Sequence, residues 1–136
     1  MDVQRLTEDK FASAVEGAAC LVIEFSDSAD DFTRRAARVA GADDVEWGHV
    51  DKGSEAQLMR RFGIEADDAL LVFREQIVFY LERGKHDPAR ISDLLTRIRA
   101  LDMQTVRAEI EAERQAELAL RMRRVCPTAL RGEIGK

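Results

Sequence analysis

Residues 20–25 read CLVIEF, an apolar run interrupted only by Glu24, and this run decides the fold class. A short continuous run of apolar residues with β-branched members is typical of a strand that is covered on both faces of a sheet. The polar residues 26–31 follow it, and residues 32–40 then carry apolar side chains at helical spacing. A buried strand that leads through a polar turn into a helix indicates an α/β domain.

The sequence on either side of this unit continues the alternation of helix and strand. The expected elements are a helix over residues 6–15, a strand over 45–50, a helix over 54–62, strands over 69–73 and 77–81, and a helix from Pro88 to Leu101. Only three polar residues join the two late strands, which makes them an antiparallel pair. Thr7 and Asp87 stand where N-caps are expected, and Gly63 stands where the helix over 54–62 should stop.

The composition is that of one globular domain with accessory segments. The chain has 136 residues, of which 46% are hydrophobic and 35% charged, so it is too apolar for disorder and too short for two ordinary domains. Its formal charge of -5 disfavours binding to nucleic acids and to anionic membranes. The apolar runs are far shorter than the roughly 20 residues that cross a bilayer. The first residues lack a basic region followed by an apolar one, so we expect a cytoplasmic protein.

Residues 103–136 differ in charge from residues 1–102. They hold seven bases and five acids, a net charge of +2, which leaves -7 for the preceding part. Residues 103–125 suit a helix, with glutamates in the first half and arginines in the last, an order that the helix dipole favours. Their apolar residues keep no regular period, so a sustained coiled coil is not expected. Pro127 follows the helix, and residues 126–136 read as a flexible tail.

Several positions within residues 3–102 match the pattern of a known protein family. Glu24 stands in the core strand where thioredoxins commonly keep a buried acid, and Asp51 resembles the acid that ends their next strand. The stretch 62–64 followed by 70–73, and Gly84 after the last strand, also match that family if two residues are inserted after Asp51. The sequence therefore resembles the thioredoxin family. That resemblance implies an α/β fold with a central mixed sheet flanked by helices, to which residues 103–125 add a C-terminal helical extension.

The redox site of the resembled family is missing. The family carries Cys-x-x-Cys at the start of the helix after the core strand, and this sequence has Asp30 and Thr33 in place of the two cysteines. Asp68 replaces the cis-proline that faces the site, so we expect a trans peptide bond there. Disulfide exchange needs a thiolate and a second thiol. His49 and His86 give no catalytic triad by sequence, so we expect no enzyme activity, no cofactor and no metal.

Two groups of residues are candidates for partner binding. One is an acidic group at the vestigial site, and the other is a basic group near the end of the predicted C-terminal helix. The first comprises Asp30, Asp31, Asp67 and Asp68, with Asp27 nearby, and the second comprises Arg121, Arg123, Arg124 and Cys126. The alternative interpretation is that the aspartates cap a helix and solvate a loop, and that the arginines are a solvated helix end. No aromatic residue follows Tyr80, which disfavours a site for single-stranded nucleic acid.

The sequence thus predicts a redox-inactive thioredoxin-like protein that binds another polypeptide as a chaperone, an assembly factor or a fixed subunit. Some bacterial cysteine-free members of the family assist hydrogenase assembly, but no residue here singles that role out. One alternative is a single-cysteine redox or peroxide-handling protein that acts through Cys126. Another is a structural protein that forms oligomers through the C-terminal helix. The partner and the oligomeric state are not given by the sequence.

Overall fold

A computed structural model describes residues 2–64 and 67–125 of the chain. The chain divides into two compact units, Met1–Arg99 and Ala100–Lys136, and each is considered by itself. Within the described residues, no helix is long and apolar enough to cross a membrane.

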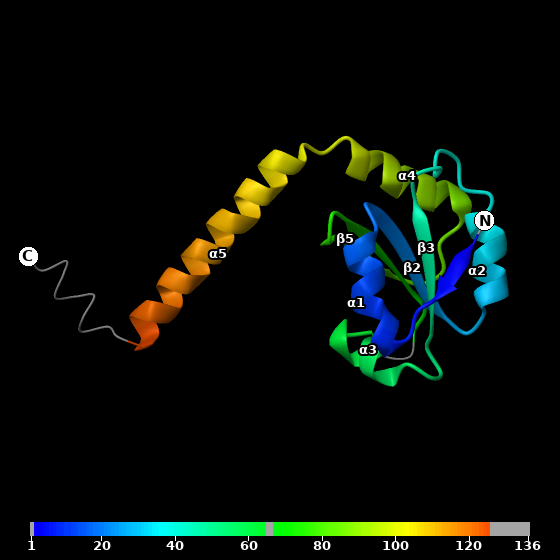
Figure 1. Cartoon of the computed structure of the whole chain (residues 1–136), viewed down its shortest axis with the longest axis horizontal. Helices are drawn as coiled ribbons and strands as arrows, with labels where there is room; N and C mark the ends of the chain where they lie inside the picture. The colour runs from blue at the N-terminus through cyan, green and yellow to red at the C-terminus, as the bar shows by residue number, and fades with distance from the viewer. Residues whose placement is uncertain (1, 65–66, 126–136) are drawn as a thin grey trace, which may run out of the picture. The chain divides into compact units, whose positions relative to one another are not determined.

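The first unit is built on one five-stranded mixed sheet (Figure 1). Its strands are β1 (Val3–Arg5), β2 (Cys20–Ser26), β3 (Glu46–Asp51), β4 (Ala69–Arg74) and β5 (Ile77–Arg83). They lie in the order β1-β3-β2-β4-β5, and β1, β3 and β2 run parallel. β4 and β5 complete the sheet as an antiparallel pair, with β4 antiparallel to β2. The central position of β2 and the antiparallel late strands confirm the predictions from the sequence. The three-residue β1 was not predicted.

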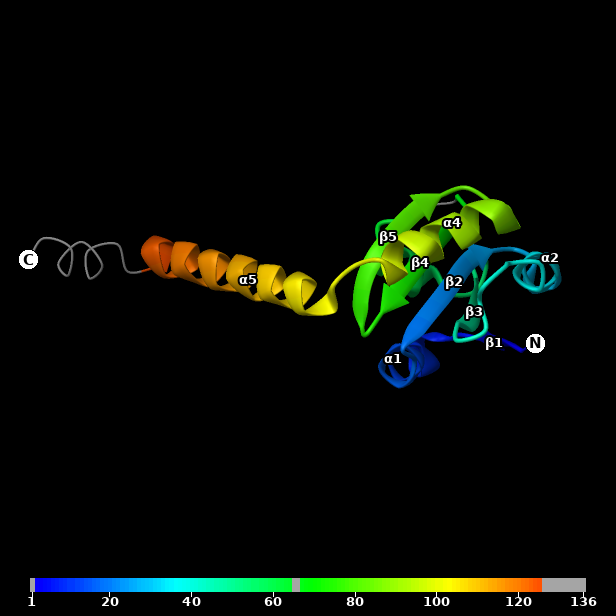
Figure 2. The same cartoon turned by 90° about the horizontal axis from the view of Figure 1, so that it is seen from above.

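Four helices cover the two faces of this sheet. They are α1 (Glu8–Gly17), α2 (Ala29–Ala36), α3 (Ala56–Arg61) and α4 (Pro88–Arg99). Phe11 of α1 and Leu58 of α3 pack in one core cluster, whereas Phe32 of α2 and Leu94 of α4 pack in the other. Figure 2 accordingly shows α1 and α4 on opposite sides of the sheet. Alternate residues of β2 point into the two clusters, which explains why its apolar run is continuous.

Some helices and strands begin or end at other residues than predicted. α2 begins at Ala29 rather than at residue 32, because the Ser28 hydroxyl caps it by accepting a hydrogen bond from the backbone N–H of Asp31 at 3.1 Å. Thr7 does precede α1, but its side chain makes no capping hydrogen bond. β5 extends to Arg83, beyond the predicted residue 81. The other predicted helices and strands lie within a few residues of their expected ends.

The described part of the second unit, up to residue 125, contains one helix, α5 (Met103–Val125). Asp102 caps it, because its carboxylate accepts hydrogen bonds from the backbone N–H of Gln104 at 3.0 Å and from the Thr105 hydroxyl at 2.9 Å. Leu118, Leu120 and Met122 are among the large apolar side chains that are about half exposed on this helix. The predicted tail, residues 126–136, lies outside the described residues.

Candidate functional site

The candidate site lies where β2 and β3 end and α2 begins. Ser26 ends β2 and is in register with Asp51, which ends β3, and α2 starts three residues after Ser26. The carboxyl ends of parallel strands beside a helix N-terminus are the usual place for ligands in α/β proteins. Asp30 and Thr33, which the resemblance aligns with the redox positions of thioredoxins, lie in the first turns of α2.

The polar side chains at the start of α2 contact residues of their own helix, and Asp31 also contacts Lys85. The Thr33 hydroxyl donates to the backbone carbonyl of Ala29 at 2.8 Å. The Asp31 carboxylate accepts a hydrogen bond from Arg35 Nε at 3.0 Å and lies 3.7 Å from Lys85 Nζ. The hydrogen bond from Arg35, aided by neighbouring positive charges, lowers the pKa of Asp31. These contacts stabilise the start of α2, whose N-cap is Ser28 rather than one of the aspartates.

A buried polar cluster lies beneath α2. The Glu24 side chain is completely buried, and its Oε2 accepts hydrogen bonds from Arg35 Nη2 at 2.7 Å and from Ser26 Oγ at 2.9 Å. Ser26 Oγ also lies 2.8 Å from Nε2 of the buried His49. Among the described residues, Glu24 Oε1 has no hydrogen-bond partner. A buried carboxylate of this kind depends on its ion pair, because an unpaired charge in the core is strongly unfavourable.

The hydrogen-bond pattern shows that Ser26 is not an activated nucleophile. A hydroxyl has one proton, and Ser26 donates it to Glu24 Oε2, so in this arrangement that proton is not available to His49 Nε2. A serine nucleophile needs the opposite arrangement, in which histidine accepts the hydroxyl proton. Burial also lowers the pKa of His49, which keeps the ring neutral. The cluster is therefore structural, although the sequence did not show that these residues meet.

Arg35 connects this cluster to a second loop. Its Nη1 donates to the backbone carbonyl of His86 at 2.9 Å, and its guanidinium lies 5.6 Å from the centre of the Phe32 ring. His86 is itself buried and lies 3.0 Å from a Glu82 oxygen. One arginine thus holds β2, α2 and the loop before α4 together.

Asp68, which the resemblance aligns with the family's cis-proline, forms an ion pair. Lys52 Nζ lies 2.7 Å from Asp68 Oδ1 and 3.7 Å from Asp27 Oδ2, and the hydrogen bond to Asp68 raises the pKa of Lys52. Asp67 lies 3.9 Å from Arg83. No peptide bond in residues 2–64 and 67–125 is cis, which agrees with the trans geometry expected at Asp68. Bases therefore neutralise most of the predicted acidic group.

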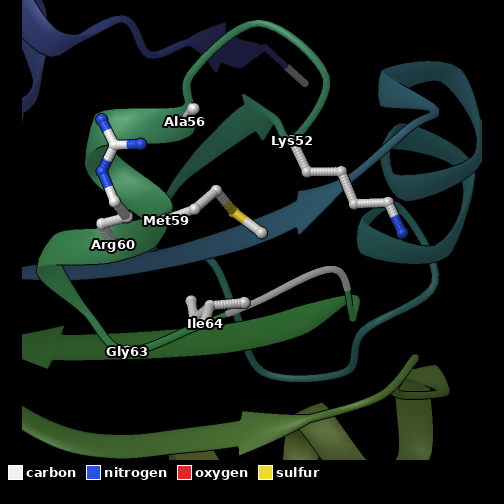
Figure 3. A pocket seen from close by; sticks show the side chains of 6 residues that line it. All are labelled: Lys52, Ala56, Met59, Arg60, Gly63 and Ile64. Atoms are coloured by element: carbon white, nitrogen blue, oxygen red, sulfur yellow. The ribbon is translucent and has the colours of Figure 1, made fainter.

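A hollow of 530 Å³ lies beside α3 (Figure 3). It is lined by Lys52, Ala56, Met59, Arg60, Gly63 and Ile64. Met59 comes from α3 and Ile64 from the segment that follows it, and both are buried members of the core. Gly63 has a φ of 67°, which only glycine adopts without strain. The sequence indicated Gly63 as a helix stop but did not indicate the hollow.

The described residues bring no thiol to the start of α2. Cys20 is buried at the first position of β2, whereas α2 follows the last position of that strand. Burial is the main cause that raises the pKa of Cys20, so the thiol stays protonated and unreactive. Cys126 lies outside the described residues. Within those residues, no group of three or more His, Cys, Asp or Glu side chains could hold a metal ion.

The candidate basic group belongs to the second unit. Arg121 is exposed on α5 and lies 3.2 Å from Glu117, one helical turn earlier. Arg123 and Arg124 lie in the last turn of α5. The three arginines therefore lie near the end of α5, Cys126 lies outside the described residues, and the role of the group in binding stays a prediction.

The chain is similar to thioredoxins in sequence and in structure. No family model matches the sequence. A putative thioredoxin 2 of Streptomyces coelicolor is 34% identical over 74 residues, which are 54% of this chain and 54% of that protein. The chain thus spans about half the length of this curated relative.

Solved structures establish the fold. A mutant thioredoxin from Halobacterium salinarum superposes with a TM-score of 0.62 at 14% identity, over 74% of this chain and 94% of that one. A mutant thioredoxin from Entamoeba histolytica gives a TM-score of 0.58 at 11% identity, over 71% of this chain and 99% of that one. The first unit therefore has the thioredoxin fold, as the resemblance implied. At these identities the likeness concerns the fold alone.

Proposed function

We propose that the chain is a redox-inactive protein with a thioredoxin fold that binds another polypeptide as a chaperone, an assembly factor or a fixed subunit. The observation that carries this proposal is that Asp30 and Thr33, which the resemblance aligns with the exchanging cysteines, lie at the start of α2 and contain no sulfur. Neither side chain can attack a disulfide or release a mixed disulfide. The fold is retained without the sulfur atoms that give it redox chemistry.

The contacts around α2 support a rigid binding surface. Arg35 fastens α2 to Glu24 and to the backbone of His86, and Lys52 fastens Asp68 beside the start of the helix. A surface held in one conformation loses little entropy when a partner binds. The buried charges therefore maintain the shape of the former active site after its chemistry is gone.

Affinity capture tests the binding role. The full chain is used as bait, and a captured polypeptide is then purified and its dissociation constant measured by calorimetry. Asp30→Lys reverses an exposed charge at the start of α2, and Asp9→Lys is the matched control in α1. We expect Asp30→Lys to weaken binding at least tenfold and Asp9→Lys to change it less than twofold. Equal binding by both variants and the native chain would show that α2 is not in the interface.

A second candidate function is association of two copies through α5. By sequence, residues 103–113 carry three glutamates and one arginine, a charge of -2, and residues 114–125 carry four arginines and one glutamate, a charge of +3. An antiparallel pair of α5 helices would place opposite charges side by side and would cover the exposed Leu118 and Met122. Sedimentation equilibrium should then show a dimer that Leu118→Glu with Met122→Glu dissociates. A native monomer at 100 µM, on the order of a weak dimer's dissociation constant, would exclude this role.

A further inference from the structure

We infer that the hollow beside α3 binds a peptide segment in which large apolar side chains adjoin an acidic residue. This inference rests on the proposed function, because it names the class of polypeptide that the domain recognises. The hollow, defined by the six lining residues of Figure 3, has a volume of 530 Å³. Ligand sites in proteins are typically about 300–1,000 Å³, so a pair of large side chains can enter it.

The floor of the hollow is apolar. Met59 is 4% exposed and Ile64 is 3% exposed, and both belong to the core cluster on the α1 and α3 face of the sheet. Methionine is unbranched and polarisable, so Met59 can adjust its rotamer to the shape of an entering side chain. Gly63 has no side chain, and a Cβ at this position would have no atom within 4 Å. The hollow is therefore open at Gly63, where no described side chain lies between solvent and the apolar floor.

Among the described residues that line the hollow, the charged side chains are basic. Two of its six lining residues, Lys52 and Arg60, are bases, and none is an acid. The ammonium group of Lys52 is held by Asp68, whereas Arg60 is exposed and has no acidic partner among the described residues. An acidic side chain on the bound segment would pair with Arg60, and a basic one would be repelled. The arrangement therefore selects an acidic, apolar peptide over a basic one.

Fluorescence anisotropy with labelled peptides tests this selection on the full chain. The probe is an eight-residue peptide with a central Leu-Phe pair flanked on each side by Asp-Glu, and its counterpart carries Lys-Arg at the flanks. We expect the acidic peptide to bind at least tenfold more tightly than the basic one. Arg60→Glu should weaken binding of the acidic peptide at least tenfold. Arg97→Glu, an exposed reversal on α4, should change it less than twofold.

Methyl resonances locate the peptide independently of affinity. The structure describes three of the four methionines, and among those three Met59 alone lines the hollow. With labelled methionine methyl groups, the acidic peptide should shift the Met59 signal and leave those of Met103 and Met122 unchanged. An unmoved Met59 signal, no binding at 1 mM peptide (a free energy of about -4 kcal/mol), or equal binding by the Arg60→Glu chain would overturn the inference.

Failure of this inference is distinguishable from failure of the proposed function. If a purified partner binds the Arg60→Glu chain as tightly as the native chain, the hollow is not its site, but polypeptide binding elsewhere on the domain still stands. Reduction of a disulfide substrate by the native chain would instead overturn the redox-inactive role, whatever the peptide result.

Discussion

Replacing Arg35 by methionine tests whether the buried Glu24 depends on its ion pair. The Arg35→Met substitution keeps a long apolar side chain but removes the Nη2 donor 2.7 Å from Glu24 and the donor to the His86 carbonyl. Removing one partner of a buried pair costs about 3–5 kcal/mol, because the remaining charge is left unpaired in the core. The Arg35 side chain is 17% exposed. Some water therefore reaches the site, and we expect a loss near the lower value.

Urea unfolding measures this loss. The chain has one tryptophan, Trp47, which is 2% exposed and packs 5.9 Å from the Phe32 ring, so its fluorescence reports loss of the core beside α2. With an m-value of roughly 1.5 kcal/mol/M, a loss of about 3 kcal/mol lowers the urea midpoint by about 2 M. The exposed Arg34→Met is the control, and its midpoint should change little, since surface substitutions usually stay within about 0.5 kcal/mol.

A double variant separates the unpaired charge from lost packing. Combining Arg35→Met with Glu24→Leu removes both charges, so the remaining cost is about 1 kcal/mol for each of the hydrogen bonds that Ser26 and the His86 carbonyl lose. The double variant should therefore be more stable than Arg35→Met alone. If the double variant were as unstable as the single one, or if Arg35→Met cost less than about 1 kcal/mol, the buried pair would not be what holds α2 in place.

Three further substitutions test other parts of the structure. Burial lowers the pKa of His49, so below about pH 6.5 the unfolded chain binds more protons than the folded chain, and stability should fall as the pH drops from 7.5 to 5.5. Over the same pH range, the urea midpoint of His49→Gln should fall less than that of the native chain. Parallel pH profiles of the two chains would contradict this. In a chain with Cys126→Ser, the buried Cys20 should react with iodoacetamide only in urea, and rapid alkylation of the folded chain would be inconsistent with its raised pKa. Gly48→Ala would place a Cβ 2.5 Å from Leu6 Cδ1, so calorimetry should show a loss of about 1–3 kcal/mol, whereas an unchanged melting temperature would refute the close contact.

The order of the main elements could be predicted because the signals are local. The apolar run at 20–25 identifies the central strand, and Asp87 with Pro88 identifies the start of α4, where Asp87 Oδ1 accepts the N–H of Arg90 at 2.8 Å. β1 could not be predicted in this way, because three residues give no period. Its pairing with β3 depends on a contact between segments more than 40 residues apart, such as Val3 with Trp47.

The buried cluster was missed because its members are separated in the sequence. Glu24 and Ser26 are two residues apart in β2, so they share a face, but His49 joins them only through the register of β2 with β3. Arg35 reads as one of several surface bases in the sequence, and only the packing of α2 on the sheet turns it inward. The sequence did offer one signal for this cluster, namely the expected parallel pairing of the strand that carries Glu24 with the strand that carries His49.

Reduction of insulin by dithiothreitol, followed as turbidity, tests most directly whether this domain has lost disulfide exchange. We predict that the native chain and a Cys126→Ser variant both leave the rate equal to that of dithiothreitol alone, while an ordinary thioredoxin accelerates it in the same plate. Acceleration by the native chain comparable to that thioredoxin would contradict the central claim, and its loss in Cys126→Ser would assign the chemistry to Cys126.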